Sequence, residues 1–153
     1  MGQNNMLKHY LIIGLIISLL TLFNSCSTTN MYALGAEFKI VNKTNYNITF
    51  EEPLLQEYNV LANGTKVFTV TQRTGTRIKR ALPSDYFSQF SLPGRDMLLV
   101  KFNGNMCLSM KGKEGINNIR DINSFVAEKL GNVNYKFTYT FTEADYNRAV
   151  ACP

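Results

Sequence analysis

Hydrophobic and polar residues alternate along much of the chain beyond residue 36, and this pattern predicts strands that bury one face. The clearest alternation covers 135–142, where Tyr135, Phe137, Tyr139 and Phe141 point to one side while threonines and a lysine point to the other. We interpret the aromatic side as a core face rather than as a platform for stacking sugar rings. Strands are predicted over residues 37–42, 46–50, 65–73, 76–82, 97–102, 105–110 and 135–142.

Turn-forming residues separate these strands and predict how they connect. The strongest hairpin signal is Asn103-Gly104, so we expect the apolar run 97–102 to be a central strand that pairs with the next one. Residues 43–45 predict a turn that makes an opening hairpin, and residues 74–75 predict a second hairpin. About eight short strands joined by tight turns indicate an all-β fold. We expect an antiparallel β-sandwich of Greek-key or immunoglobulin-like type, or a small barrel, without parallel crossovers.

Two segments toward the C-terminus carry helix signals. Four apolar residues within 119–130 fall near one face of a helix, although an extended segment fits the same residues. Thr142 and Asp145 have the spacing of a capping box, which predicts one or two helical turns through 146–150. We therefore expect one or two short helices near the C-terminus of the sandwich.

The N-terminus follows a different pattern. After a polar start with Lys8, residues 10–23 form an uncharged apolar run that is shorter than the about 20 residues a membrane-spanning helix needs. Such a run is typical of the apolar region of a secretory signal. An uncleaved anchor helix and a plain signal followed by a free Cys26 are the alternatives.

The residues after this run carry a recognisable motif. Leu22-Phe23-Asn24-Ser25-Cys26 places an apolar residue upstream of a small residue and a cysteine, and polar residues 27–30 follow. This stretch resembles the lipid-attachment box of a bacterial lipoprotein precursor, in the looser form found in the Bacteroidota. The resemblance implies that a diacylglyceryl group is attached to the Cys26 sulfur, that the chain is cleaved after Ser25, and that the new amine is acylated.

The same resemblance implies a domain organisation and a location. It divides the chain into a signal peptide at 1–25, a lipidated tether at 26–35 and one β-sandwich domain at 36–153. Two or three acyl chains hold a protein on a membrane essentially permanently, whereas one chain binds only marginally. Because Ser27 is not the aspartate that retains many lipoproteins in the inner membrane, the implied location is the outer membrane, facing the periplasm. Residues 135–149 also resemble small Bacteroidota lipoproteins of unknown function, which share a Tyr/Phe/Thr strand running into Thr-Glu-x-Asp-Tyr.

If Cys26 carries lipid, two cysteines remain in an oxidising compartment. A disulfide between Cys107 and Cys152 would tie the C-terminal tail to an inner strand, and the closed loop of about 45 residues would stabilise the fold by about 3–4 kcal/mol. A buried Cys107 and a loose Cys152 fit the sequence as well. A catalytic thiol is disfavoured, because the mature chain has no histidine and no cation lies close to Cys107 in sequence.

Composition excludes several kinds of chemistry. The 45% of hydrophobic residues and 18% of charged residues describe one ordinary folded domain. The single histidine, His9, lies in the segment predicted to be removed, so no histidine-dependent triad, no metal site and no cofactor are expected. Paired carboxylates are the remaining route to an enzyme. The candidates are Glu51, Glu52, Asp85, Asp96 and Asp121. Glu51 and Glu52 are adjacent, so on a strand their side chains would face opposite sides and could not act together. We therefore predict that the protein is not an enzyme.

One cluster of charge changes this picture in a chain whose formal net charge is +5. Arg73, Arg77, Lys79 and Arg80 flank the predicted turn at 74–75. The functional hypothesis is that these cations contact anionic lipid head groups or an acidic partner. The alternative is a solvated hairpin whose charges discourage edge pairing. Nucleic acid is not an expected partner in this compartment.

The predicted function follows from the anchor and the lack of catalytic groups. We expect a non-enzymatic binding or structural module, held on the membrane by acyl chains on Cys26, that engages an envelope protein or a glycan. An immunity-type inhibitor of an incoming toxin is one alternative. A carboxylate-dependent hydrolase, which would need two acids in one cleft, is the other.

Overall fold

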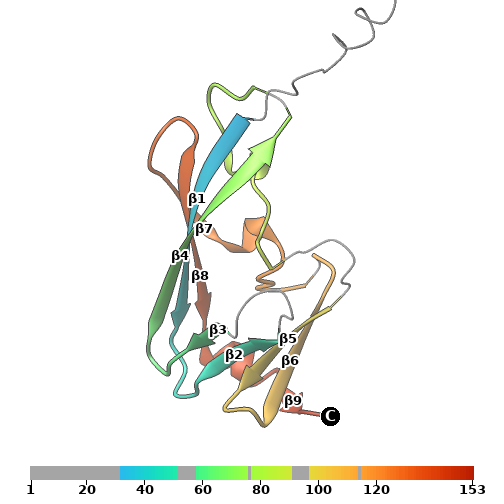
Figure 1. Cartoon of the computed structure of the whole chain (residues 1–153). Coiled ribbons are helices and arrows are strands. Elements are labelled where there is room, and N and C mark those ends of the chain that lie inside the picture. The colour runs from blue at the N-terminus through green and yellow to red at the C-terminus, as the bar shows by residue number, and fades with distance from the viewer. Residues whose placement is uncertain (1–31, 52–57, 76, 91–96, 114) are drawn as a thin grey trace, which may run out of the picture. The chain divides into compact units, whose positions relative to one another are not determined.

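Two β-sheets form the domain in the computed structural model, which describes residues 32–51, 58–75, 77–90, 97–113 and 115–153 (Figure 1). Sheet A has the strand order β4-β1-β8-β7, and sheet B has the order β3-β2-β5-β6-β9. The strands are β1 (Tyr32–Asn42), β2 (Ile48–Glu51), β3 (Tyr58–Val60), β4 (Thr65–Thr74), β5 (Met97–Phe102), β6 (Met106–Lys111), β7 (Val126–Lys129), β8 (Asn134–Phe141) and β9 (Val150–Ala151). The helical segments are the 3₁₀ turns η1 (Pro83–Asp85) and η2 (Ile122–Ser124) and the short helix α2 (Glu143–Tyr146).

The predicted all-β sandwich with a short C-terminal helix is confirmed, with one difference in pairing. β1 and β8 run parallel, with Gly35 opposite Asn134, whereas every other described strand pair is antiparallel. Hairpins constrain only strands that follow each other in sequence. β1 and β8 are separated by most of the domain, so tight turns elsewhere say nothing about their relative direction.

The predicted opening hairpin is wrong, because β1 and β2 belong to different sheets. The buried side chain of Asn42 holds the chain where it leaves sheet A: its Nδ2 donates to the carbonyl oxygens of Tyr46 at 2.7 Å and Leu61 at 3.0 Å. Its Oδ1 accepts from the Thr44 backbone N–H at 2.9 Å. These bonds bend 42–46 away from a two-strand turn and direct the chain into sheet B.

Two further local predictions differ from the structure. Residues 77–82 form no strand, so the predicted hairpin around 74–75 is absent and β4 pairs only with β1 among the described strands. Within 119–130, the single turn η2 and the strand β7 replace the helical alternative. Val126 and Leu130, two of the apolar residues on the predicted helical face, are exposed, so that face as a whole is not buried to stabilise a helix.

Other local signals are confirmed. Asn103 and Gly104 have φ angles of 47° and 77°, and they connect β5 to β6 as the hairpin signal predicts. β5 lies in the middle of sheet B, as its apolar sequence indicates. The capping box of α2 is present, with the Thr142 N–H donating to the Asp145 carboxylate at 2.8 Å.

Aromatic side chains from both sheets fill the core. Phe38 of β1 lies between Phe68 and Phe137, with ring centroids 5.4 Å from each. Phe50 of sheet B packs against Phe141 of sheet A at 5.8 Å. The alternating aromatic residues of β8 are therefore core, as expected, since all four are buried. The compact unit spans 31–153, and β1 begins at residue 32, inside the segment predicted to be a tether.

No helix among the described residues is long and apolar enough to cross a bilayer. The predicted signal peptide and Cys26 lie outside the described residues.

Candidate functional site

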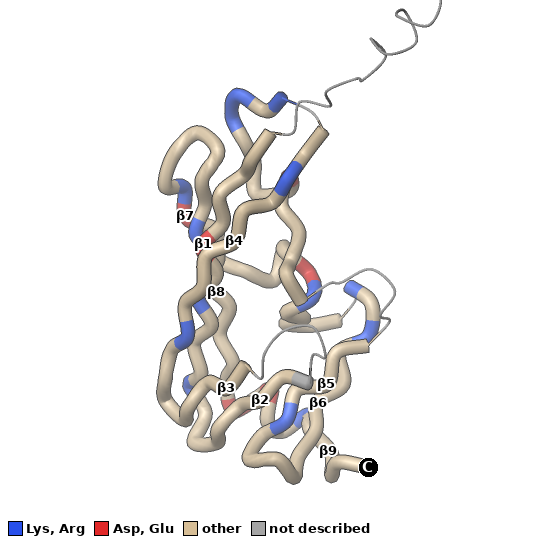
Figure 2. The backbone as a smooth tube through the Cα atoms, viewed as in Figure 1, with Lys and Arg blue, Asp and Glu red and all other residues tan. Residues whose placement is uncertain are grey.

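The basic residues predicted to contact an anionic partner are gathered at one end of sheet A (Figure 2). Arg73 lies next to the C-terminal residue of β4, and Arg77, Lys79 and Arg80 follow on an irregular segment. All four side chains are exposed, and none of them forms an ion pair with another described residue. We call these four residues the basic cluster.

Two apolar contacts orient the irregular segment that carries three of these cations. The side chain of Ile78 packs against the core, and Ala81 is fully buried. The Ala81 backbone N–H also donates to the carbonyl oxygen of Asn132 at 2.7 Å. With these two positions held inward, the intervening and flanking cations project into solvent. The hairpin predicted for them is absent, but their proximity to Arg73 does not depend on it.

The basic cluster lies where the domain begins. Tyr32 pairs with Thr74 and Ala33 pairs with Arg73 at the first residues of β1. The chain that arrives from the N-terminal side therefore enters the fold directly beside the cations. This placement was not visible in the sequence, where about 40 residues separate the two segments.

The two candidate carboxylates whose side chains are described each take part in a local turn. Asp85 accepts from the Leu82 backbone N–H at 2.7 Å and so closes the turn of η1. Asp121 caps η2, accepting from the Asn123 backbone N–H at 3.0 Å. Glu52, Asp96 and the side chain of Glu51 lie outside the described residues. Each described candidate thus has a local structural role of the kind that Asp commonly takes at helix starts.

Cys107 and Cys152 form a disulfide with their Cα atoms 4.9 Å apart. Cys107 is in β6 and is 3% exposed, and Cys152 directly follows the two-residue strand β9. The Cys152 backbone N–H also donates to the carbonyl oxygen of Asn105 at 3.0 Å. The bridge therefore holds the C-terminal tail along the edge of sheet B, and neither sulfur is a free nucleophile.

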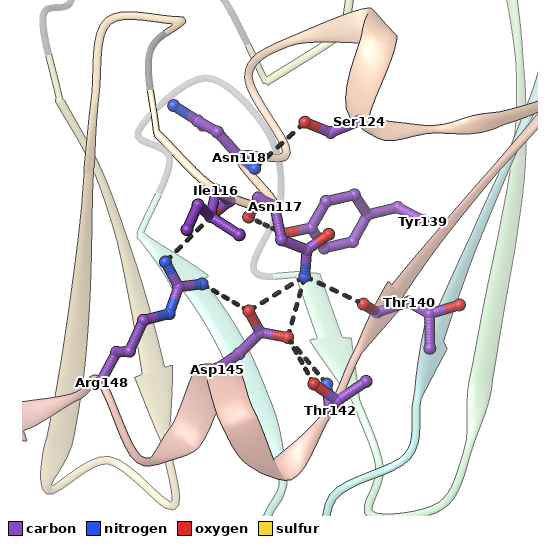
Figure 3. A network of polar contacts seen from close by, with 9 residues as sticks. All are labelled: Ile116, Asn117, Asn118, Ser124, Tyr139, Thr140, Thr142, Asp145 and Arg148. Carbon is purple, nitrogen blue, oxygen red and sulfur yellow. Dashed lines mark hydrogen bonds and ion pairs between the residues drawn. The ribbon is translucent and has the colours of Figure 1, made fainter.

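A buried polar network around Asp145 was missed in the sequence (Figure 3). The Asp145 carboxylate is 2% exposed and accepts from Asn117 Nδ2 at 2.9 Å on both oxygens. It also accepts from the Thr142 N–H at 2.8 Å and from Arg148 Nη2 at 2.5 Å. Arg148 Nη1 donates to the carbonyl oxygen of Ile116 at 3.0 Å. The capping-box spacing pointed to Asp145, but nothing in the sequence pointed to Asn117.

The same network includes a phenol. Tyr139 donates its O–H to the carbonyl oxygen of Asn117 at 2.5 Å. Burial raises the pKa of Tyr139 far above its ordinary value, and the nearby Asp145 charge raises it further. Both carboxylate oxygens of Asp145 accept hydrogen bonds and Tyr139 stays neutral, so the network fastens loop 115–118 to β8 and α2.

No group of three or more histidine, cysteine or acidic side chains is placed to hold a metal ion within the described ranges. Comparison with family models, with curated proteins and with solved structures found no match to this chain.

Proposed function

We propose that this protein is a lipid-anchored envelope protein, held through acyl chains on Cys26 in the outer membrane and facing the periplasm. In this proposal it acts as a non-enzymatic binding or structural module, and the basic cluster contacts anionic head groups or an acidic envelope partner. The observation that carries the proposal is the position of the basic cluster beside the start of β1. That start is six positions after the cysteine of the lipid-attachment box.

The length of the connection supports a role at the bilayer surface. Six residues span at most about 20 Å when fully extended, so an anchor at Cys26 keeps the basic cluster within about that distance of the bilayer. Charges interact appreciably with an anionic surface over about 8 Å at physiological ionic strength. A basic side chain near such a surface contributes about 1 kcal/mol of binding, so an acyl anchor and the basic cluster act together as two membrane signals.

The anchor is tested by the substitution Cys26→Ala, with Ser27→Ala as the matched control. We expect C26A to lose incorporation of labelled palmitate and to leave the membrane fraction, while S27A keeps both. A C26A chain that stays in the membrane fraction would contradict the lipid anchor and favour the uncleaved helix.

The surface contact is tested with the full-length lipidated chain in vesicles of phosphatidylethanolamine alone or mixed with phosphatidylglycerol. The probe is the rate at which an acetylating reagent modifies Lys79, compared with exposed Lys111 at the end of β6 in the other sheet. We expect anionic vesicles to slow modification of Lys79 alone and 0.5 M salt to restore it, since the screening length falls to about 4 Å at that salt concentration. Equal rates for Lys79 in both vesicle types would contradict the contact with head groups.

A further inference from the structure

Within the part of the chain that the structure describes, one edge of the strand β4 has no pairing strand. β4 has ten residues, all matched one to one with β1 without a bulge, and no described strand pairs with its other side. The other edge strands of the described sheets are short: β7 has four residues, β3 has three and β9 has two. Short edges are one of the ways in which proteins avoid pairing with other chains, so β4 is the exception in this domain.

The direction of the backbone groups of β4 follows from the register. The Asn42 N–H donates to the carbonyl oxygen of Gly64, the residue before β4, at 2.9 Å. The N–H of the next residue, Lys43, donates in the opposite direction, to the carbonyl oxygen of Phe141 in β8. Because backbone groups alternate in direction along a strand, the even-numbered residues of β4 bond to β1. The odd-numbered residues turn their N–H and C=O groups to the open edge, and their side chains lie on the outer face; they are Thr65, Val67, Thr69, Thr71 and Arg73.

The neighbouring chain segment does not cover this edge. Gln72 is buried, and its side chain exchanges hydrogen bonds with the backbone of Phe87, at 2.8 Å to the carbonyl oxygen and 3.2 Å from the N–H. Phe90 continues into the core, where its ring lies 6.1 Å from that of Phe68. Residues 86–90 therefore lie beneath the inner face of β4 and do not cover its outward backbone groups.

The usual protections against edge pairing are also missing from β4. It contains no proline, and its charges are confined to Lys66 and Arg73 near the two ends. Between them lie six uncharged residues in which Val67 is 49% exposed, and Phe68 and Val70 are only partly buried. This is an uncharged stretch rich in β-branched residues, which is the composition of a strand that pairs.

We propose that the open edge of β4 pairs antiparallel with β4 of a second copy of this chain, with Thr69 on the two-fold axis. In this register Thr69 faces the partner's Thr69, and Val67 faces the partner's Thr71. On the inner side, Phe68 faces the partner's Val70. Sheets A of the two copies join into one continuous sheet.

Side-chain pairing in this register favours a second copy as the occupant. Lys66 lies opposite the partner's Gln72, and Arg73 lies opposite the partner's Thr65, so no two cations face each other. Threonine–threonine and aromatic–β-branched pairs are among the favourable cross-strand pairs. Centring the axis on Val67 or Thr71 leaves part of the strand unpaired, whereas centring it on Thr69 uses all the outward backbone groups from Thr65 to Arg73.

The symmetry has a consequence for a membrane-anchored pair. The two-fold axis stands perpendicular to the joined sheet. It therefore places the first residue of β1 in one copy and the first residue of β1 in the other copy at opposite ends of the paired β4 strands. Two copies on one bilayer then lie with β4 parallel to the bilayer surface. The pairing itself does not rest on the lipid anchor, and its test is separate from that of Cys26.

The test is disulfide crosslinking of full-length chains in membranes, with the wild-type chain as background for its own cysteines. Directly opposed residues of an antiparallel pair have Cα atoms about 5.5 Å apart, which a disulfide can bridge. Residue 67 of the two copies would be separated by about 13 Å along the strand, which is too far. The variants are Thr69→Cys, Val67→Cys alone, Val67→Cys with differently tagged Thr71→Cys, and Thr138→Cys, which is on the same face of interior strand β8.

We expect dimers from T69C and mixed dimers from V67C with T71C, while V67C alone and T138C give no more dimer than wild type. T69C at the wild-type level, or V67C alone dimerising as well as T69C, overturns the proposal. Crosslinking of T69C to a chain of another mass also overturns it, since a different protein would then occupy the edge.

Proline at an outward position gives an independent measurement. Thr69→Pro removes an edge N–H without breaking a bond to β1, and Ala127→Pro does the same on the short edge strand β7. We expect sedimentation of the detergent-solubilised chain to show dimers for wild type and A127P and monomers for T69P, with the disulfide intact in all three. Monomeric wild type at all concentrations contradicts the proposal.

Discussion

Removing the carboxylate of Asp145 is the sharpest test of how this fold is held together. The Asp145→Ala substitution leaves α2 without its capping box and leaves the buried side-chain amide of Asn117 without its carboxylate acceptor. It also breaks the ion pair with Arg148, whose side chain is 42% exposed. We expect a loss of stability far larger than that of an ordinary surface substitution.

The magnitude follows from these contacts one by one. A buried hydrogen bond to a charged group contributes about 1.5–3 kcal/mol, which applies to Asn117. The cap on the Thr142 N–H contributes about 1 kcal/mol. The half-exposed ion pair with Arg148 adds about 0.5 kcal/mol, because solvent screens it. The free energy of unfolding should therefore fall by about 3–4.5 kcal/mol.

The assay is equilibrium urea unfolding followed by circular dichroism, with Asp121→Ala as the matched control. Asp121 also caps a short helical turn, but it is half-exposed and, among the described residues, its carboxylate bonds only to Asn123, so its loss should cost about 1 kcal/mol. Arg148→Ala should cost about as little, because Asp145 keeps its other donors. If D145A and D121A lower the unfolding free energy equally, the network around Asp145 is not the stabilising unit that we describe.

Three other perturbations have defined outcomes. Tyr139→Phe should lower the free energy of unfolding by about 1 kcal/mol at neutral pH. Because the pKa of Tyr139 is raised in the folded protein, this residue should leave wild-type stability unchanged below pH 10 and lower it above pH 10. In a pH series of urea unfolding, the wild type should therefore lose stability above pH 10 more steeply than the variant. Cys152→Ser should lower stability by about 4 kcal/mol, and reductant should do the same to wild type but nothing further to the variant. Asn103→Ala, at a φ of 47°, should cost about 1 kcal/mol in thermal unfolding, whereas Asn105→Ala in the same hairpin should cost less.

Local signals in the sequence were sufficient for much of the fold. Alternation identified β8 and much of β1 and β2, because a strand with one buried face must repeat every two residues. A β-branched stretch identified β4, and an apolar run identified β5. The Asn103-Gly104 dipeptide identified a hairpin because both positions need a positive φ. The even number of cysteines after Cys26 made a bridge possible, but only the pairing of β6 with β9 brings Cys107 and Cys152 together.

The candidate site depended on distant segments, and there the sequence was less informative. It identified the basic cluster as a group of cations, but the hairpin expected to gather them does not exist. Their position beside the start of β1 comes from pairing between Tyr32 and Thr74. Asp145 was recognised as a capping residue, yet its strongest partner, Asn117, is in a loop with no pattern of its own.

By itself the sequence determined the all-β class, most strand positions and the C-terminal capping box, because each of these depends on residues within a few positions of one another. The tertiary structure alone decided that β1 runs parallel to β8, that Asn42 sends the chain into the second sheet, and that β4 keeps an open edge. These features depend on which strands meet across the core, and the free energy of burying Phe38, Phe50 and Phe141 together selects that arrangement over every local alternative.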